Sequence, residues 1–238
     1  MTDYKTILIA ITTGVLPVFL WLWFWLKEDR EDPEPKGLII ITFILGMFAV
    51  NLVLPIEKIV DKLIANQIIV IGAWAFIEEI FKYFAAWAVA FHTKFVDEPI
   101  DYPIYMLTAA LGFAAFENIL FLLNPSVGGE VLLSALTGNL RFLGATLLHI
   151  IASSAIGIAL GLAFYRQKYK FLYLLVGIIL ATGLHSVFNF FIMKSEGNDF
   201  LKVFAFVWVF AIIIILLFEK LRRMCPYHPE GHGLSLKT

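Results

Sequence analysis

Seven apolar runs, each about long enough to cross a lipid bilayer, dominate this chain of 238 residues. A helix of about 20 apolar residues spans the hydrocarbon core and satisfies its own backbone hydrogen bonds there. We therefore predict an all-α, polytopic transmembrane helical bundle. The expected spans are residues 6–26, 37–55, 66–91, 102–123, 142–164, 171–193 and 200–218. Only 16% of the residues are charged, against about 25% in soluble domains, which excludes an ordinary soluble protein.

Two segments between these runs are ambiguous. Residues 131–136 are apolar but too short to cross a bilayer, so they form either a separate surface helix, which would make eight helices, or an early start of the fifth span. Residues 56–63 alternate apolar and charged side chains. This pattern predicts an amphipathic helix at the membrane interface before the third span.

The expected domain organisation is a single transmembrane domain at residues 1–219, followed by a tail at 220–238 that we predict to be disordered. The first apolar run lacks a small-residue cleavage site and is interpreted as a retained span. The tail contains Cys225, His228 and His232, which are metal-ligand types, but their spacing is irregular and they have too few partners for a zinc site.

The distribution of lysine and arginine predicts the orientation, because basic residues favour the cytoplasmic side. Of the 18 basic residues, all but Lys82 lie in two alternating sets of loops. One set has eleven: Lys27, Arg30, Lys36, Lys94, Arg166, Lys168, Lys170, Lys220, Arg222, Arg223 and Lys237. The other has six: Lys5, Lys58, Lys62, Arg141, Lys194 and Lys202. We expect the N-terminus outside and the C-terminal tail in the cytoplasm.

Three charges interrupt the third run, at Glu78, Glu79 and Lys82. Inserting a charged side chain at the centre of a membrane helix costs about 2.5–3.5 kcal/mol of free energy on insertion scales. Such residues are therefore expected to have a function. Glu78 and Lys82 are one helical turn apart. The lysine can neutralise one carboxylate, while the other stays protonated or shares a proton, because two adjacent like charges resist joint ionisation.

Further polar residues lie within the later spans. They are Glu117 and Asn118 in the fourth, His149 in the fifth, and His185 and Asn189 in the sixth. Glu117, His149 and His185 each lie roughly 9–12 Å below the outer end of their helix, at about 1.5 Å per residue. Glu78 lies somewhat deeper. These depths predict one polar site in the outer half of the membrane.

Small residues accompany both histidines on their helical stripes. Gly157 follows His149 at a multiple of four residues, and Gly177 precedes His185 in the same way. Because small side chains let membrane helices approach closely, we expect the two histidines to be brought near each other.

These groups can catalyse hydrolysis without a covalent intermediate. A glutamate with a neighbouring histidine activates water as a general base. His185 and Asn189, one turn apart, can donate hydrogen bonds to the oxygen on which charge develops. Ser153 and Ser186 neighbour the histidines, but neither lies in the GxSxG turn of a serine nucleophile.

A zinc site is the alternative, because two histidines and a glutamate are a known catalytic ligand set. Its ligands would be Glu78, His149 and His185. The helical H-E-x-x-H pattern is absent, so the histidines would have to come from different helices. We therefore expect no cofactor and keep zinc as the second possibility.

Four motifs on successive spans resemble those of the PrsW family of intramembrane proteases. They are Glu78-Glu79-x-x-Lys82, Phe116-Glu117-Asn118, His149 with Gly157 eight residues later, and His185-x-x-x-Asn189. The acidic, proline-bearing loop at residues 29–35 also resembles the family's. This family is grouped with the CAAX prenyl proteases, the bacteriocin-processing enzymes and a subunit of gamma-secretase.

The resemblance implies a glutamate-dependent membrane endopeptidase of the prokaryotic cell membrane, acting on a membrane-anchored protein and not on nucleic acid. Glu78 or Glu79 would activate water with His149, and His185 with Asn189 would lie near the oxyanion; the prenyl-protease relatives favour Glu78 as the base. The residues expected to support them are Lys82, Glu117, Asn118 and Arg141. Phe121 stands where relatives often have tyrosine, so that hydroxyl is missing here.

Two non-enzymatic functions remain open. The same polar residues could hold helices together in a non-catalytic scaffold, like the related subunit of gamma-secretase. Intramembrane glutamate and histidine also serve as proton relays in carriers. The absence of an inverted repeat and of paired broken helices argues against a carrier.

Overall fold

The computed structural model describes residues 4–28, 32–123, 131–194 and 200–225. All regular secondary structure in these ranges is helical, which confirms the predicted all-α class. The helices are α1 (Tyr4–Glu28), α2 (Lys36–Leu63), α3 (Gln67–Val89), α4 (Asp101–Leu123), α6 (Val131–Leu162), the short 3-10 helix η1 (Gln167–Tyr169), α7 (Lys170–Lys194) and α8 (Phe200–Arg222).

Four helical segments of the described chain are long and apolar enough to cross a membrane: Lys36–Leu63, Asp101–Leu123, Gly144–Leu162 and Gln167–Phe191. A shorter apolar segment is Gly14–Lys27. These helices support an integral membrane protein. The count of seven spans stays a prediction.

The structure decides two expectations about the connecting segments. Residues 131–136 form the first turns of α6, so of the two alternatives for this stretch the early start of the fifth span is right. Residues 56–63 are not a separate helix either, because α2 continues through Pro55 to Leu63. A proline is tolerated within a membrane helix when its surroundings satisfy the freed backbone group.

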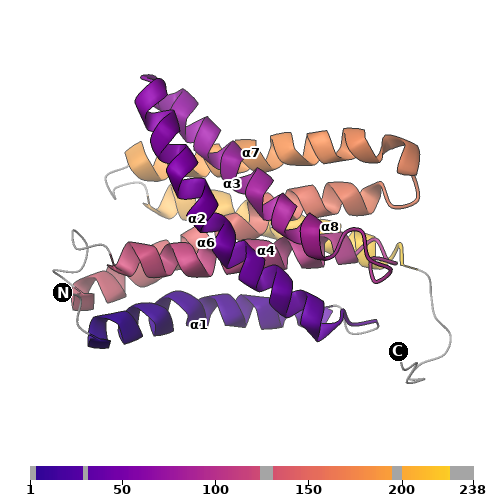
Figure 1. Ribbon diagram of the computed structural model, residues 1–238, viewed down its shortest axis with the longest axis horizontal. Helices are drawn as coiled ribbons and strands as arrows, with labels where there is room; N and C mark the ends of the chain where they lie inside the picture. Colours follow the sequence, from indigo (N-terminus) through magenta and orange to yellow (C-terminus); the bar gives the residue numbers. More distant parts are fainter. Residues whose placement is uncertain (1–3, 29–31, 124–130, 195–199, 226–238) are drawn as a thin grey trace.

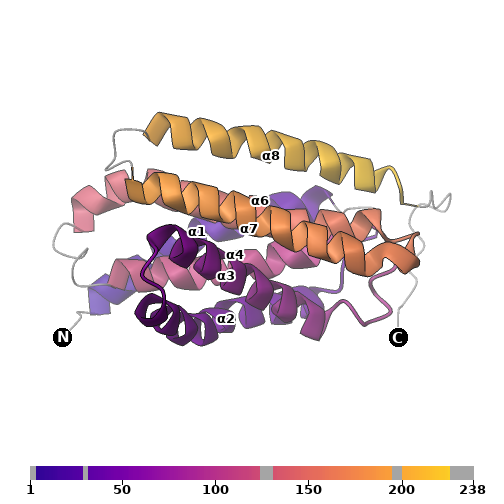
Figure 2. The same cartoon turned by 90° about the horizontal axis from the view of Figure 1, so that it is seen from above.

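Helix α4 lies at the centre of the bundle and packs against α1, α2 and α6 (Figures 1 and 2). Every residue from Asp101 to Ala115 is buried. At the crossing of α2 and α4, a Cβ added to Gly46 would overlap the backbone of Ala109. Gly112 stands equally close to the backbone of Phe43. Backbones in direct contact hold α2 and α4 in a fixed position.

Helices α6 and α7 also approach closely, as their small residues predicted. A Cβ added to Gly177 of α7 would lie 2.9 Å from the Cα of Ile156 in α6. Gly157 of α6 packs in turn on the backbone of Pro103 in α4. This close packing brings the histidines of α6 and α7 together, while α3 crosses these helices diagonally in Figure 1.

Candidate active site

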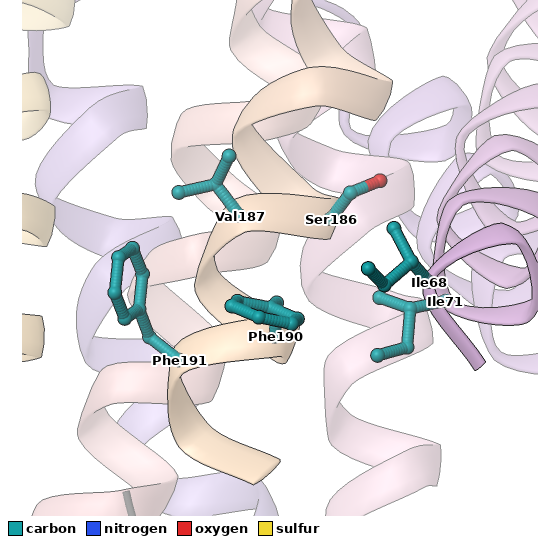
Figure 3. A pocket seen from close by; sticks show the side chains of 6 residues that line it. All are labelled: Ile68, Ile71, Ser186, Val187, Phe190 and Phe191. Carbon is teal, nitrogen blue, oxygen red and sulfur yellow. The ribbon is translucent and has the colours of Figure 1, made fainter. Parts of the chain in front are cut away.

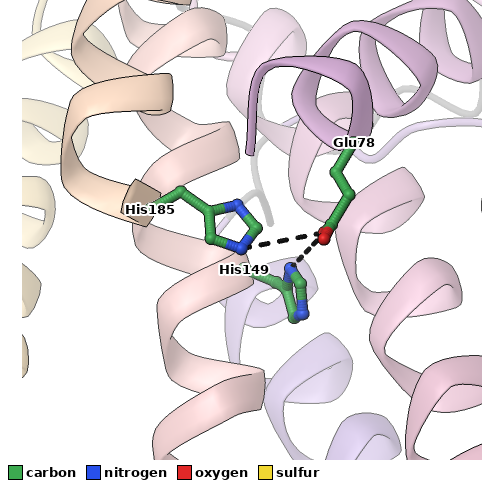
Figure 4. Close-up of side chains that lie close together, drawn as sticks. All are labelled: Glu78, His149 and His185. Carbon is green, nitrogen blue, oxygen red and sulfur yellow. Dashed lines mark ion pairs between the residues drawn. The ribbon is translucent and has the colours of Figure 1, made fainter. Parts of the chain in front are cut away.

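Ionisable side chains from four helices meet inside the bundle. Helix α3 contributes Glu78, Glu79 and Lys82, α4 contributes Glu117, α6 contributes His149, and α7 contributes His185. All of them except Glu117 are buried. Figure 4 shows both imidazole rings turned towards the carboxylate of Glu78. The expected single polar site is therefore present as a cluster of side chains.

The position of α3 follows from its first turn. The side chain of Asn66 caps the helix and accepts hydrogen bonds from the backbone N–H groups of Ile68, at 3.0 Å, and Ile69, at 3.3 Å. Such a cap satisfies donors that the first turn of a helix leaves unpaired. From this start, Glu78, Glu79 and Lys82 fall on the inward face.

Lys82 is the centre of the cluster. Its Nζ lies 2.8 Å from Glu79 Oε1, 3.2 Å from Glu78 Oε2 and 2.8 Å from His149 Nδ1. It also lies 4.4 Å from the ring centroid of Phe113, which adds a cation–π contact. Because an ammonium group only donates hydrogen bonds, Nδ1 of His149 must accept one and carries no proton.

The second nitrogen of His149 fixes its tautomer. Nε2 lies 2.7 Å from Oε2 of Glu117, to which it donates its proton. The lone pair of Nδ1 faces the cluster, 3.8 Å from Glu78 Oε2. His149 is thus a neutral imidazole whose orientation is set by Glu117 on one side and Lys82 on the other.

His185 is arranged in the same way with its nitrogens exchanged. Its Nδ1 lies 2.9 Å from Oε1 of Glu79 and donates to that carboxylate. Its Nε2 lies 3.7 Å from Glu78 Oε2. Ser153 donates to the other oxygen of Glu79 at 2.6 Å. Glu79 therefore accepts from three donors, Lys82, Ser153 and His185, and positions His185.

The donor set of Glu78, His149 and His185 fits a divalent metal ion. One ligand atom from each residue can be chosen so that all three lie within 4.8 Å of one another. Metal-binding histidines usually donate their second N–H to a carboxylate. Both histidines do so here, to Glu117 and Glu79. Two histidines and a carboxylate are a known ligand set for catalytic zinc.

The charge balance agrees with a cation at this position. Three carboxylates, Glu78, Glu79 and Glu117, are opposed by one ammonium group, that of Lys82. With His149 neutral, one or two negative charges, depending on whether His185 is protonated or neutral, stay uncompensated at a largely buried site, which is costly. A divalent ion would cancel them.

The predicted mismatch in depth does not separate Glu78 from the histidines. Its Oε2 lies within 3.8 Å of both imidazoles. The diagonal course of α3 and the length of the glutamate side chain account for this, because depth along one helix does not equal depth along a tilted neighbour.

Asn118, a predicted supporting residue, does not join the cluster. Its Nδ2 donates to the backbone oxygen of Gly14, at 3.4 Å, and to Oγ1 of Thr146, at 3.2 Å. It thereby ties α4 to α1 and α6. The buried amide is a packing residue that holds the helix carrying Glu117.

The other predicted residues fall in different places. Asn189 lies one turn beyond His185, partly buried, and its side chain has no hydrogen bond within the part of the chain that the structure describes. The side chain of Arg141, and His228 and His232 of the tail, lie outside the described residues. Cys225 is described, and its Sγ lies 3.5 Å from the backbone oxygen of Leu221.

Two residues near the cluster had no predicted role in it. Glu57, assigned to an interfacial helix, turns towards the site because α2 continues, and its carboxylate interacts electrostatically with those of Glu78 and Glu117. Ser153 was considered only as a nucleophile. Its position one turn after His149 was the available signal that it faces the same cluster.

Comparisons with known proteins show the family of the chain. The family model described as PrsW family intramembrane metalloprotease matches residues 34–217, which include every residue of the cluster. The chain belongs to the PrsW family of intramembrane proteases. The resemblance predicted from the four motifs is confirmed. It is thus an integral membrane protein of a protease family.

Curated relatives support this assignment. The chain is similar to Protease PrsW of Geobacillus kaustophilus, with 31% identity over 78% of this chain and 80% of that protein. The same name is given to relatives in Oceanobacillus iheyensis, 28% identical, and Bacillus subtilis, 24% identical, each over 85% of this chain and 92% of the relative. No solved structure matches the chain. The family's description includes a metal, so the expectation of no cofactor is not confirmed.

Proposed function

We propose that this protein is an endopeptidase that hydrolyses a peptide bond of a membrane-anchored protein, with a divalent metal ion held by Glu78, His149 and His185. The observation that carries the proposal is the convergence of one nitrogen of each imidazole on the carboxylate of Glu78, with each imidazole held from behind by another carboxylate. A polar clasp between helices would not need two imidazoles that each turn a nitrogen towards the same carboxylate and are each held from behind by another one.

When bound, such an ion polarises the scissile carbonyl and lowers the pKa of a water molecule. Glu78 is the proposed base. Its Oε2 faces the histidines and Lys82, while its Oε1 has no hydrogen bond among the described residues. Oε1 is therefore available to take the proton of the attacking water and deliver it to the leaving amine.

The remaining residues position this centre. Glu117 holds His149 and Glu79 holds His185, each fixing the tautomer that directs a lone pair inward. Lys82 offsets the charge of the paired glutamates. With His185 as a ligand, Asn189 is the proposed hydrogen-bond donor of α7 to the oxyanion.

Water, the second substrate, needs a route to the cluster. The side chain of Glu117 is 48% exposed, whereas that of Glu78 is 10% exposed and that of Glu79 fully buried. The side of the cluster at Glu117 is the proposed entrance for water.

We also infer the topology from the distribution of basic residues. The proposal comprises seven spans in residues 1–219, an external N-terminus and a cytoplasmic tail at 220–238. This places the start of α3, the end of α7 and the active site towards the outer leaflet. Single cysteines introduced into a Cys225→Ser background at Lys94 and at Asn66 test it. An impermeant maleimide added to intact cells should label only the second.

Cleavage by the purified protein in liposomes tests the function. The substrates are model transmembrane peptides with randomised residues at both ends of the apolar span, and the products are identified by mass spectrometry. His149→Ala should abolish cleavage. The matched control is His92→Ala, because His92 is an exposed histidine outside the cluster, bonded to the backbone oxygen of Trp87 and packed against the ring of that residue. Cleavage by His149→Ala at the rate of the wild type would rule out the proposed site.

A further inference from the structure

An apolar groove of about 360 Å³ lies between the start of α3 and the end of α7. Figure 3 shows its lining side chains: Ile68 and Ile71 from α3, and Ser186, Val187, Phe190 and Phe191 from α7. Ser186 is the only polar residue among them, and its hydroxyl already donates to the backbone oxygen of Thr182 at 2.6 Å. The groove therefore suits an apolar occupant.

The groove adjoins the active site along both helices. Ser186 directly follows His185, and Ile71 precedes Glu78 by two turns on the same face of α3. At about 1.5 Å per residue, the groove reaches from the level of His185 to roughly 10 Å beyond it. An extended peptide advances about 3.3 Å per residue. A peptide with its scissile bond at the cluster thus places a side chain two or three residues away into the groove.

The groove is open at the surface of the helical bundle. Ile71 forms its buried floor, with 3% exposure, whereas Ile68 is 66% exposed and Val187 is 39% exposed. Next to the lining, a Cβ added to Gly72 or to Gly183 would meet no atom within 4 Å. A segment in the bilayer can enter sideways, and the volume lies within the range of about 300–1,000 Å³ typical of ligand sites.

We propose that this groove is a specificity subsite that binds a large apolar side chain of the substrate's membrane segment. The side chain is that of leucine, isoleucine, methionine or phenylalanine, two or three residues from the cleaved bond. This inference rests on the proposed function, which supplies a membrane-anchored peptide at the adjacent cluster. It adds what the catalytic residues do not determine, namely which sequence is cut.

A pair of tryptophan substitutions tests the subsite. Val187→Trp fills the groove, and Val176→Trp is the control, because Val176 lies three turns earlier on the same face of α7 and is 45% exposed. With the randomised peptides, the wild type and the control should prefer large apolar residues at one position. Val187→Trp should lower cleavage of those peptides by about 10-fold or more, as pocket contacts do, and shift the preference to alanine or glycine.

Binding without turnover separates this inference from the proposed function. Peptides carrying a diazirine analogue of leucine at the preferred position are photolysed with the Glu78→Gln variant in liposomes. If no peptide is cleaved by the wild type, the analogue is placed at each randomised position in turn. Adducts on the lining residues are expected, and they should disappear with Val187→Trp in the same background but persist with Val176→Trp.

The combinations of cleavage and labelling results distinguish the subsite from the proposed function. Adducts in the groove without cleavage by the wild type would overturn the proposed function and leave the groove as a peptide site. Cleavage with an unchanged preference in Val187→Trp and no adducts would overturn the subsite alone. Neither cleavage nor adducts would overturn both. A photoreactive phosphatidylcholine that labels the groove and is not displaced by peptide would show a lipid site instead.

Discussion

Two clusters of buried carboxylates occupy this bundle, and they differ in how their oxygens are used. In the second cluster, the hydroxyl of Tyr105 donates to Glu34, next to the carboxyl of Asp101. Oδ2 of Asp101 accepts from the backbone N–H groups of Asp97, at 2.9 Å, and Glu98, at 2.7 Å. The hydroxyl of Tyr105 and two backbone N–H groups thus hold these carboxylates, and the cluster connects the loop before α2 to the start of α4. We call it the closed cluster.

The cluster around Glu78 differs in that not every nitrogen and oxygen facing its centre has a hydrogen-bond donor among the described residues. We call it the open cluster. Both imidazoles have one nitrogen held by a carboxylate and the other within 3.8 Å of Glu78, where that of His149 also accepts from Lys82. Buried carboxylates are common to both clusters, so burial of a carboxylate alone does not distinguish the proposed active site from a structural contact. Orientation of lone pairs towards a common point, without donors to satisfy all of them, separates a site from a structural contact.

The largest expected effect is on the open cluster. Glu78→Gln keeps the shape of the side chain but removes the base, so cleavage of the model peptides should fall by about 10²–10⁴-fold. Asp101→Asn, the equivalent change in the closed cluster, should leave the activity of each folded molecule unchanged. Single-turnover cleavage normalised to folded protein measures both. Equal losses of cleavage activity in the two variants would show that the two clusters do not differ in their role in catalysis.

A smaller effect is expected for the carboxylates behind the histidines. Glu79→Gln and Glu117→Gln each weaken the hold on one imidazole, and substitution of such partners typically lowers metal affinity by about 10–100-fold. Competition with a zinc-binding dye measures the affinity. Asp101→Asn is again the control. Unchanged affinity in both glutamine variants would show that these carboxylates do not orient ligands.

In the closed cluster, the expected effect is on stability instead. Tyr105→Phe removes the donor to Glu34, which is 8% exposed. The loss of a partner at a buried acceptor should lower the free energy of unfolding by about 1–3 kcal/mol. Unfolding by denaturant in detergent micelles measures it, with peptide cleavage assayed in parallel. A loss of cleavage in the folded variant would assign this cluster to the active site.

The smallest effect concerns Cys225, which lies beside the closed cluster. Burial, with the nearby negative charge of Glu98, raises the pKa of its thiol to about 12. Because the thiolate is the reactive form, maleimide labelling at pH 8 should be at least about tenfold slower in the folded protein than after unfolding. Glu98→Gln should speed the labelling modestly. Equal rates in the folded and unfolded protein would contradict this.

The sequence predicted the helical class and the convergence of Glu78, His149 and His185 in one polar cluster, because apolar length defines membrane helices and a buried charge stands out within them. Glu78, His149 and His185 were found in this way. The pairing of His149 with Glu117 and of His185 with Glu79 was not predicted. It depends on the rotation of each helix about its axis, which small differences in packing at Gly157 and Gly177 determine.

The predicted helix boundaries were wrong where the packing of the whole bundle outweighed a local sequence signal. The charges in residues 56–63 predicted a separate interfacial helix, yet α2 continues and carries Glu57 towards the cluster. Asn118 resembled a site residue because it follows Glu117. Adjacent residues on a helix point about 100° apart, so Asn118 faces α1 and α6 instead.

Metal content measured on catalytically active protein tests the central claim most directly, namely that Glu78, His149 and His185 form one metal-dependent hydrolytic centre. Elemental analysis should find one divalent ion per chain in the wild type and in His92→Ala, and none in the His149→Ala His185→Ala double variant. Cleavage should stop on chelation and return when zinc is added. Full cleavage by a wild-type preparation that contains no bound metal would contradict the account.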